Sequence, residues 1–171
     1  MIVSNASPLI YLAKIGMLNL LEKIYDRIQI PLQVKIECVD KGKQVGYMNA
    51  LLIEKYIRKG FIIVEELPEH LLRKAENIAS EFQIDMGEAQ AILLAVYKGK
   101  KEILIDEKRA RFVAKLENLS PRGTLYVILK TIRLGLLSKE EAISKINELI
   151  EKNFYISIDV YKEFLRLLKE V

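Results

Sequence analysis

Short apolar runs rich in β-branched residues alternate along this chain with longer segments whose apolar residues recur every three or four positions. The short runs predict strands over residues 2–4, 28–30, 61–64 and 102–105, with a short fifth strand near Leu119. The longer segments predict amphipathic helices. Strands joined through helices pair in parallel, because each connection crosses a face of the sheet. The pattern therefore predicts an α/β fold of three layers, with a central parallel sheet of four to five strands flanked by helices.

Proline, glycine and capping residues set the expected ends of the helices. We expect helices over residues 8–25, 31–39, 43–58, 69–82, 86–97, 108–116 and 124–134. Ser7 followed by Pro8 predicts an N-cap and a first helical residue, since proline lacks only a donor that would be orphaned there. Ser138 and Ser157 predict the starts of two further helices, the first of which ends near Lys152.

A chain of 171 residues is long enough for one well-buried domain. We expect residues 1–137 to form the α/β domain and residues 138–171 to form a C-terminal helical extension, packed on the domain or on a partner. The extension carries two apolar stripes, formed by Ile143, Ile146 and Ile150 and by Phe164, Leu167 and Leu168. Stripes of this size predict a covering surface, either in a homodimer or with a partner protein.

Composition excludes several classes of protein. Hydrophobic residues make up 51% and charged residues 29%, which is typical of a folded chain. No apolar run approaches the ~18 residues that span a bilayer, and no signal peptide is recognisable, so we expect a cytoplasmic protein without membrane contact. The single cysteine, Cys38, excludes an internal disulfide and a thiolate zinc cluster. A net charge of +4 weakly favours a nucleic acid as partner.

Polar side chains stand where the expected strands end. Asn5 follows the first strand, and Asp106 follows the strand over residues 102–105. Glu37 lies on the helix after the second strand, and Glu88 begins a helix directly after Gly87. Oxygen ligands gathered at the carboxyl edge of a parallel sheet suit Mg²⁺ or Mn²⁺. Such ions activate water and stabilise a phosphodiester during displacement, so hydrolysis of a nucleic-acid backbone is the chemistry that these residues fit.

Each acid also has a purely structural interpretation. Glu88 stands three residues after Asp85, and the two could form a capping box. Asp106 could cap the helix that follows it. Glu37 could lie on a solvated helix face, in which case Asp40 or Asp85 would be the substitute acid.

Basic residues cluster beside the expected site. Lys108, Arg109 and Arg111 follow Asp106, and Arg122 precedes the helix that begins near Thr124. Cations and helix N-termini bind phosphate, and cations give salt-dependent affinity for nucleic acid that does not depend on its sequence. The alternative is that these basic side chains simply lie on helix faces that are exposed to solvent.

Four blocks in a fixed order carry a family resemblance. They are SNASPLI at residues 4–10, GEAQAI at 87–92, LIDEKRAR at 104–111 and GTL at 123–125. Together they resemble PIN-domain proteins, in the uncharacterised prokaryotic branch of predicted nucleic-acid-binding members that is related to the nucleases of toxin–antitoxin pairs. The similarity spans about residues 1–137.

The resemblance implies a parallel sheet, an acidic cluster that binds Mg²⁺ or Mn²⁺, cleavage of single-stranded RNA and, for the toxin branch, an antitoxin protein as partner. The first family aspartate falls on Asn5, the second acid on Glu37, the third on Glu88 and the fourth on Asp106. By this correspondence the expected catalytic acids are Asp106, Glu88 and Glu37. The expected metal ligands are Asn5, Glu88, Asp106 and Glu107. The expected nucleic-acid contacts are Ser7, Lys108, Arg109, Arg111, Arg122 and Thr124.

Asn5 departs from the family pattern. Its carbonyl oxygen can still bind a hard cation, but it carries no negative charge, which predicts weaker metal binding and weaker activation of water. The leading hypothesis is therefore a metal-dependent endonuclease of single-stranded RNA, with Asn5 expected to weaken its activity. The alternative is a catalytically degenerate PIN-like module that binds nucleic acid or protein. A flavodoxin-like receiver would need an acid pair after the first strand, and Ser4 and Asn5 do not supply one.

Overall fold

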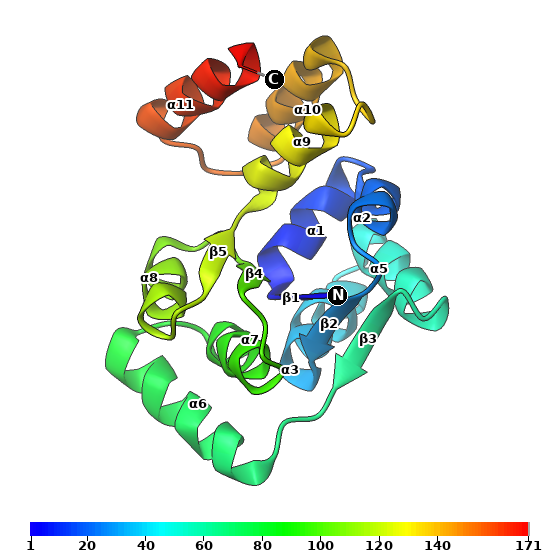
Figure 1. Ribbon diagram of the computed structural model, residues 1–171. Helices are drawn as coiled ribbons and strands as arrows, with labels where there is room; N and C mark the ends of the chain where they lie inside the picture. The colour runs from blue at the N-terminus through cyan, green and yellow to red at the C-terminus, as the bar shows by residue number, and fades with distance from the viewer. Residues whose placement is uncertain (171) are drawn as a thin grey trace.

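The computed structural model describes residues 1–170, and one five-stranded sheet forms its centre (Figure 1). The strands are β1 (Ile2–Ser4), β2 (Ile28–Pro31), β3 (Ile62–Glu65), β4 (Glu102–Leu104) and β5 (Ser120–Arg122). Their order is β3-β2-β1-β4-β5, and every neighbouring pair is parallel. The predicted α/β class is confirmed, and so is the short fifth strand.

Helices connect the strands and cover the sheet. They are α1 (Ala6–Lys14), α2 (Leu18–Ile24), α3 (Leu32–Lys35), α4 (Lys41–Gln44), α5 (Met48–Arg58), α6 (Glu69–Phe82), α7 (Met86–Tyr97), α8 (Lys108–Leu116), α9 (Thr124–Arg133), α10 (Lys139–Glu151) and α11 (Ile158–Lys169), with a π-helical segment η1 (Ile36–Asp40) between α3 and α4. Helix α7 contacts β1, β2 and β4 and is itself covered by α6. Its apolar residues are buried almost all round, as expected for a helix between two layers.

The order of the strands reverses at β1. The chain passes from β1 to β2 and β3 on one side, then returns to place β4 and β5 on the other. Because parallel connections are right-handed, α1, α2 and α5 cover one face, while α7 and α8 cover the opposite face (Figure 1). The carboxyl ends of β1 and β4 therefore border the switch point, where open α/β sheets bind their ligands.

The first helix begins earlier than predicted. Helix α1 starts at Ala6 with Asn5 in the N-cap position, so the assignment of Ser7 as the N-cap is wrong. Pro8 stands at the third helical position, where it is tolerated because no residue of the first turn needs an intrahelical donor. The expected single helix over residues 8–25 is also wrong. Gly16, with φ of +68°, adopts a left-handed conformation after α1, and a separate helix α2 follows.

The second strand–helix unit differs from prediction in a similar way. Pro31 is the last residue of β2, and α3, η1 and α4 follow one another from residue 32 to residue 44. Gly46, with φ of +76°, then separates α4 from α5, so residues 43–58 do not form one helix. The π-helical turn carries Glu37, and such turns are frequent at functional sites.

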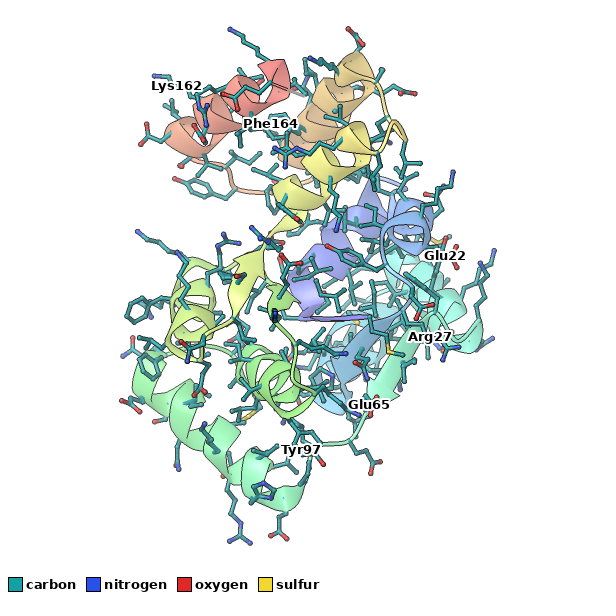
Figure 2. All side chains as sticks on the ribbon, in the orientation of Figure 1. Glu22, Arg27, Glu65, Tyr97, Lys162 and Phe164 are labelled. Atoms are coloured by element: carbon teal, nitrogen blue, oxygen red, sulfur yellow. The ribbon has the colours of Figure 1, made fainter. Side chains whose placement is uncertain are left out.

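Two C-terminal helices, α10 and α11, pack against α9 at one end of the molecule (Figure 1). Ile146, Phe164 and Leu168 are buried, and Figure 2 shows Phe164 on the side of α11 that faces α10. Ile143 and Ile150 remain 37% and 48% exposed. Much of the predicted apolar surface is thus covered by this chain itself. Within residues 1–170, no helix has the length and apolar character needed to cross a membrane.

Candidate active site

Asp106 follows β4, and three donors hold its carboxylate. The backbone N–H of Thr124 donates to Oδ1 at 2.7 Å, and the Thr124 hydroxyl donates to Oδ2 at 2.8 Å. The Ser7 hydroxyl donates to Oδ2 at 3.2 Å. A Cβ atom on Gly123 would lie 2.8 Å from Oδ1, so glycine allows the start of α9 to approach the carboxylate. Asp106 therefore binds the N-terminus of α9.

The alternative role of Asp106, as the cap of α8, is wrong. Glu107 is the N-cap residue of α8, and no side chain makes a capping hydrogen bond there. Burial raises the pKa of Asp106 above its ordinary value, although the bonds from Thr124 and Ser7 and the charge of Arg111 act in the opposite direction. An acid in this state gains stability from a nearby cation.

Asn5 lies beside Asp106 at the switch point. Its backbone N–H donates to the carbonyl of Leu104 at 3.0 Å, and it stands two residues before Ser7, which bonds Asp106. The Asn5 side chain is 3% exposed, and its Oδ1 atom has no hydrogen-bond partner. A buried acceptor without a partner costs about 1–3 kcal/mol of folding free energy. This oxygen is suited to a ligand that supplies positive charge.

Glu88 is 7% exposed at the start of α7. Its Oε2 atom accepts a bond of 3.0 Å from the backbone N–H of Asp85, and the two residues form a capping box. The pKa of Glu88 is raised to about 7, mainly by burial and also by the charges of Asp85, Glu107 and Glu37, while the bond from the Asp85 backbone acts in the opposite direction. The capping interpretation is thus correct, and Glu88 also lies within a group of acids.

Glu37 packs against the first turn of α7. A Cβ atom on Gly87 would lie only 2.6 Å from Glu37 Oε1, so glycine at position 87 makes room for this carboxylate. The side-chain amide of Gln33 donates to the same oxygen at 3.0 Å. Glu37 is half-buried and does not lie on an open helix face. The structure therefore places Glu37 against the start of α7, where its charge and that of Glu107 contribute to the raised pKa of Glu88.

The donor set fits a hard divalent cation. Within residues 1–170, no three His, Cys, Asp or Glu side chains stand close enough to surround a metal ion by themselves. Mg²⁺ requires no such cage, since it keeps several waters and takes one or two protein carboxylates. Asp106 offers a carboxylate and Asn5 a partnerless carbonyl oxygen, which are donors of the type that Mg²⁺ prefers.

The basic residues have different partners. Arg109 donates to Gln83 Oε1 at 3.0 Å, and Arg111 donates to the Ile105 carbonyl at 3.0 Å. Arg122 forms a 2.8 Å ion pair with Glu102 and lies over the ring of Tyr126. Both donors of Thr124 contact Asp106, so the structure gives this residue a carboxylate partner where sequence suggested a phosphate.

Tyr11 borders the site, although its place on a helical apolar stripe favoured a core position over base stacking. It lies one helical turn after Ser7, and burial, Asp106 and Glu107 raise its pKa. Its hydroxyl donates to the Asn153 carbonyl at 3.3 Å, and its ring meets Phe154 edge-on at 4.7 Å. The i, i+4 spacing from Ser7 was the available signal.

Comparison with known proteins identifies the family of the chain. The sequence model of a family described as a PIN domain matches residues 1–170. The chain belongs to the PIN-domain family. This is a nuclease-type family whose members generally depend on divalent metals. The match includes α10 and α11, beyond the residues on which the sequence resemblance was based.

A solved structure shows the same fold. The protein PAE2754 from Pyrobaculum aerophilum superposes with a TM-score of 0.51 over 78% of this chain and 94% of its own, at 16% sequence identity. No protein of curated function matches the chain. The fold and the family are thus established, and the reaction has to be argued from the site.

Proposed function

We propose that this PIN-domain chain is a divalent-metal-dependent endonuclease of single-stranded RNA whose activity is weakened by Asn5. The observation that carries the proposal is the buried, partnerless oxygen of Asn5, whose backbone binds the end of β4, two residues before the hydrogen-bonded carboxylate of Asp106. Mg²⁺ or Mn²⁺ held by Asn5, Asp106 and, through water, Glu88 or Glu107 would activate water and neutralise phosphate charge.

The side chains of this site would have different roles in the reaction. Ser7 and Thr124 orient Asp106, because both donate hydrogen bonds to it. Glu88, with a pKa of about 7, can exchange a proton with water near neutral pH, and Glu37 adds negative charge beside it. Lys108, Arg109, Arg111 and Arg122 would provide the positive charge that attracts the RNA backbone.

One observation favours a second candidate function. Asn5 is neutral where the resemblance expects an aspartate, which lowers the number of charged ligands available to a metal ion. A protein with this site could hold RNA, or a partner protein, without cutting. This candidate predicts salt-sensitive RNA affinity with no cleavage in any metal.

We also propose that residues 138–170 act as an extension that contacts a second copy of the chain or an antitoxin protein, in the cytoplasm. Exposed apolar residues on this extension support the proposal, since Ile150, Tyr155 and Ile158 are 48%, 88% and 72% exposed. Sedimentation of the purified chain tests the homodimer, and a monomer at all concentrations would remove it.

A cleavage assay tests the nuclease. The chain is incubated with a mixed pool of single-stranded RNA in Mg²⁺, in Mn²⁺ and in chelator. We expect cleavage with either metal, no cleavage in chelator, and loss of cleavage in Asp106→Asn. The matched control is Asp26→Asn, because Asp26 is exposed just before β2, at the opposite edge of the sheet. Cleavage that persists in Asp106→Asn, or in chelator, would contradict the proposal.

A further inference from the structure

A groove of about 550 Å³ lies between the end of α6 and the start of α8. The two helices contact each other, and Figure 1 shows them side by side. The residues that line the groove are Glu81, Phe82, Gln83, Lys108, Arg109 and Phe112. Its volume falls within the range of about 300–1,000 Å³ that is usual for small-ligand sites.

The groove and the acidic residues are close along the chain. Gln83 stands two residues before Asp85, whose backbone N–H binds Glu88. Lys108 stands two residues after Asp106. The helix ends that form the groove are therefore joined to Asp106 and Glu88 by short segments.

The lining combines an aromatic face with positive charge. Phe112 is 56% exposed, so burial in the core does not explain it. It lies four residues after Lys108, which places both side chains on the same face of α8. Neither Lys108 nor Arg109 makes an ion pair within residues 1–170. Arg109 is instead fixed by Gln83, and Glu81 is the one acid of the lining.

We propose that this groove binds one nucleotide of single-stranded RNA, with its base stacked on Phe112 and its phosphate beside Lys108 and Arg109. The inference rests on the proposed function and adds to it a base-binding subsite. Every base has a π face, so an aromatic platform accepts any sequence, and it requires a base that is not paired in a duplex. The adjacent cations bind the backbone and prefer no particular base.

Binding measurements on a fixed background test the subsite. The background is Asp106→Asn, so that cleavage does not consume the probe, and the probe is a fluorescent single-stranded RNA of ten nucleotides. Phe112→Ala is compared with Phe112→Tyr, which keeps the ring. The matched control is Leu116→Ala, because Leu116 is 55% exposed one turn further along α8 and does not line the groove.

We expect Phe112→Ala to weaken binding about 5- to 150-fold, which corresponds to the loss of one stacked base. Phe112→Tyr and Leu116→Ala should each stay within about twofold of the background. The salt dependence of RNA affinity also distinguishes a phosphate contact at Lys108 from a base contact at Phe112. Lys108→Ala should lower the slope of log affinity against log salt by about 0.7, whereas Phe112→Ala should leave the slope unchanged.

Equal affinity of Phe112→Ala and Leu116→Ala would overturn the subsite and leave the proposed nuclease intact if the wild type still cuts RNA. Absence of RNA binding by both the background and the wild type would overturn both. Binding that depends on Phe112 in a chain that never cuts would support the subsite and reject the nuclease. A change from dimer to monomer in Phe112→Ala with unchanged RNA affinity would assign the groove to a protein contact and overturn the proposal.

Discussion

The two acidic groups of the site are held in opposite ways. Asp106 receives three hydrogen bonds, from Thr124 and Ser7, and lies against Gly123. Glu88 receives one, from the backbone of Asp85, and is surrounded by other acids. The first carboxylate is therefore fixed in place, whereas the second is held mainly by burial.

This difference assigns the groups different tasks. A carboxylate fixed by three donors keeps its geometry when a cation binds, which suits a ligand. A carboxylate whose pKa lies near neutrality suits the exchange of protons. Substitutions that act on one carboxylate and leave the other unchanged test this difference.

The largest effect is expected at Asp106. Asp106→Ala should reduce metal-dependent cleavage by more than about 100-fold. It should also be less stable than Asp106→Asn by about 1–3 kcal/mol. Alanine leaves all three donors without an acceptor, whereas asparagine keeps one side-chain oxygen that can accept. Cleavage assays and chemical denaturation check both statements. If the alanine and asparagine variants unfold at the same denaturant concentration, the hydrogen bonds from Ser7 and Thr124 do not fix this carboxylate.

Glu88→Gln should change the dependence of stability on pH. The folded chain holds the Glu88 proton up to a pKa of about 7, while the unfolded chain loses it near 4.5. The stabilisation that this proton provides is therefore complete below about pH 4.5 and is lost as the pH rises to 7. Glutamine does not ionise, so the variant should match wild type near pH 4 and exceed it by about 2–3 kcal/mol at pH 8.

Urea denaturation at several pH values measures this difference. Glu140→Gln is the control, since Glu140 is exposed in the first turn of α10 and makes no side-chain hydrogen bond within residues 1–170. A constant offset between wild type and Glu88→Gln from pH 4 to pH 8 would show that Glu88 does not titrate in this range.

A pair of glycine substitutions compares the fixed carboxylate with the movable one. Alanine at position 123 would press on Asp106 Oδ1, which three hydrogen bonds hold, and should cost about 1–3 kcal/mol. Alanine at position 87 would press on the end of the flexible Glu37 side chain, which can move, and helix propensity favours alanine there by about 1 kcal/mol. Gly87→Ala should therefore stay within about 1 kcal/mol of wild type. Equal losses of stability in thermal melts would contradict the contrast.

The smallest effect is expected from Asn5→Asp. A restored charge should tighten Mn²⁺ binding about tenfold and raise any cleavage rate, because hard cations respond to the number of charged ligands. Without metal, the added charge should lower the melting temperature. The variant should therefore melt below wild type in chelator and gain more from Mn²⁺. Equal Mn²⁺-linked stabilisation of both proteins would place Asn5 outside the metal site.

Local patterns predicted the parts of the fold that local physics determines. The β-branched runs predicted four strands within about a residue, and the fifth, expected near Leu119, begins at Ser120. The ends of β1 and β4 placed Asn5 and Asp106 at one edge. The start of α1 was wrong because proline is tolerated at several positions of a first turn. The break at Gly16 was missed because the apolar spacing continues across it.

The site was harder to predict than the sheet. Sequence spacing showed that Glu88 and Asp85 could form a capping box, since both partners belong to one turn. The bond between Asp106 and Thr124 joins residues 18 positions apart. The approach of Glu37 to Gly87 depends on how η1 packs against α7, which no local pattern encodes. Phe112 lies in the helix predicted over residues 108–116, and its exposure becomes visible only once α6 and α8 are placed.

The most direct test of the central claim is the position of Mn²⁺ in crystals of the wild-type chain soaked with that ion. Anomalous scattering locates manganese independently of the surrounding side chains. We predict a peak bound by Asn5 Oδ1 and a carboxylate oxygen of Asp106, with the remaining positions filled by water. A peak elsewhere in the fold, or a fully soaked crystal in which Asn5 and Asp106 bind no metal, would contradict it.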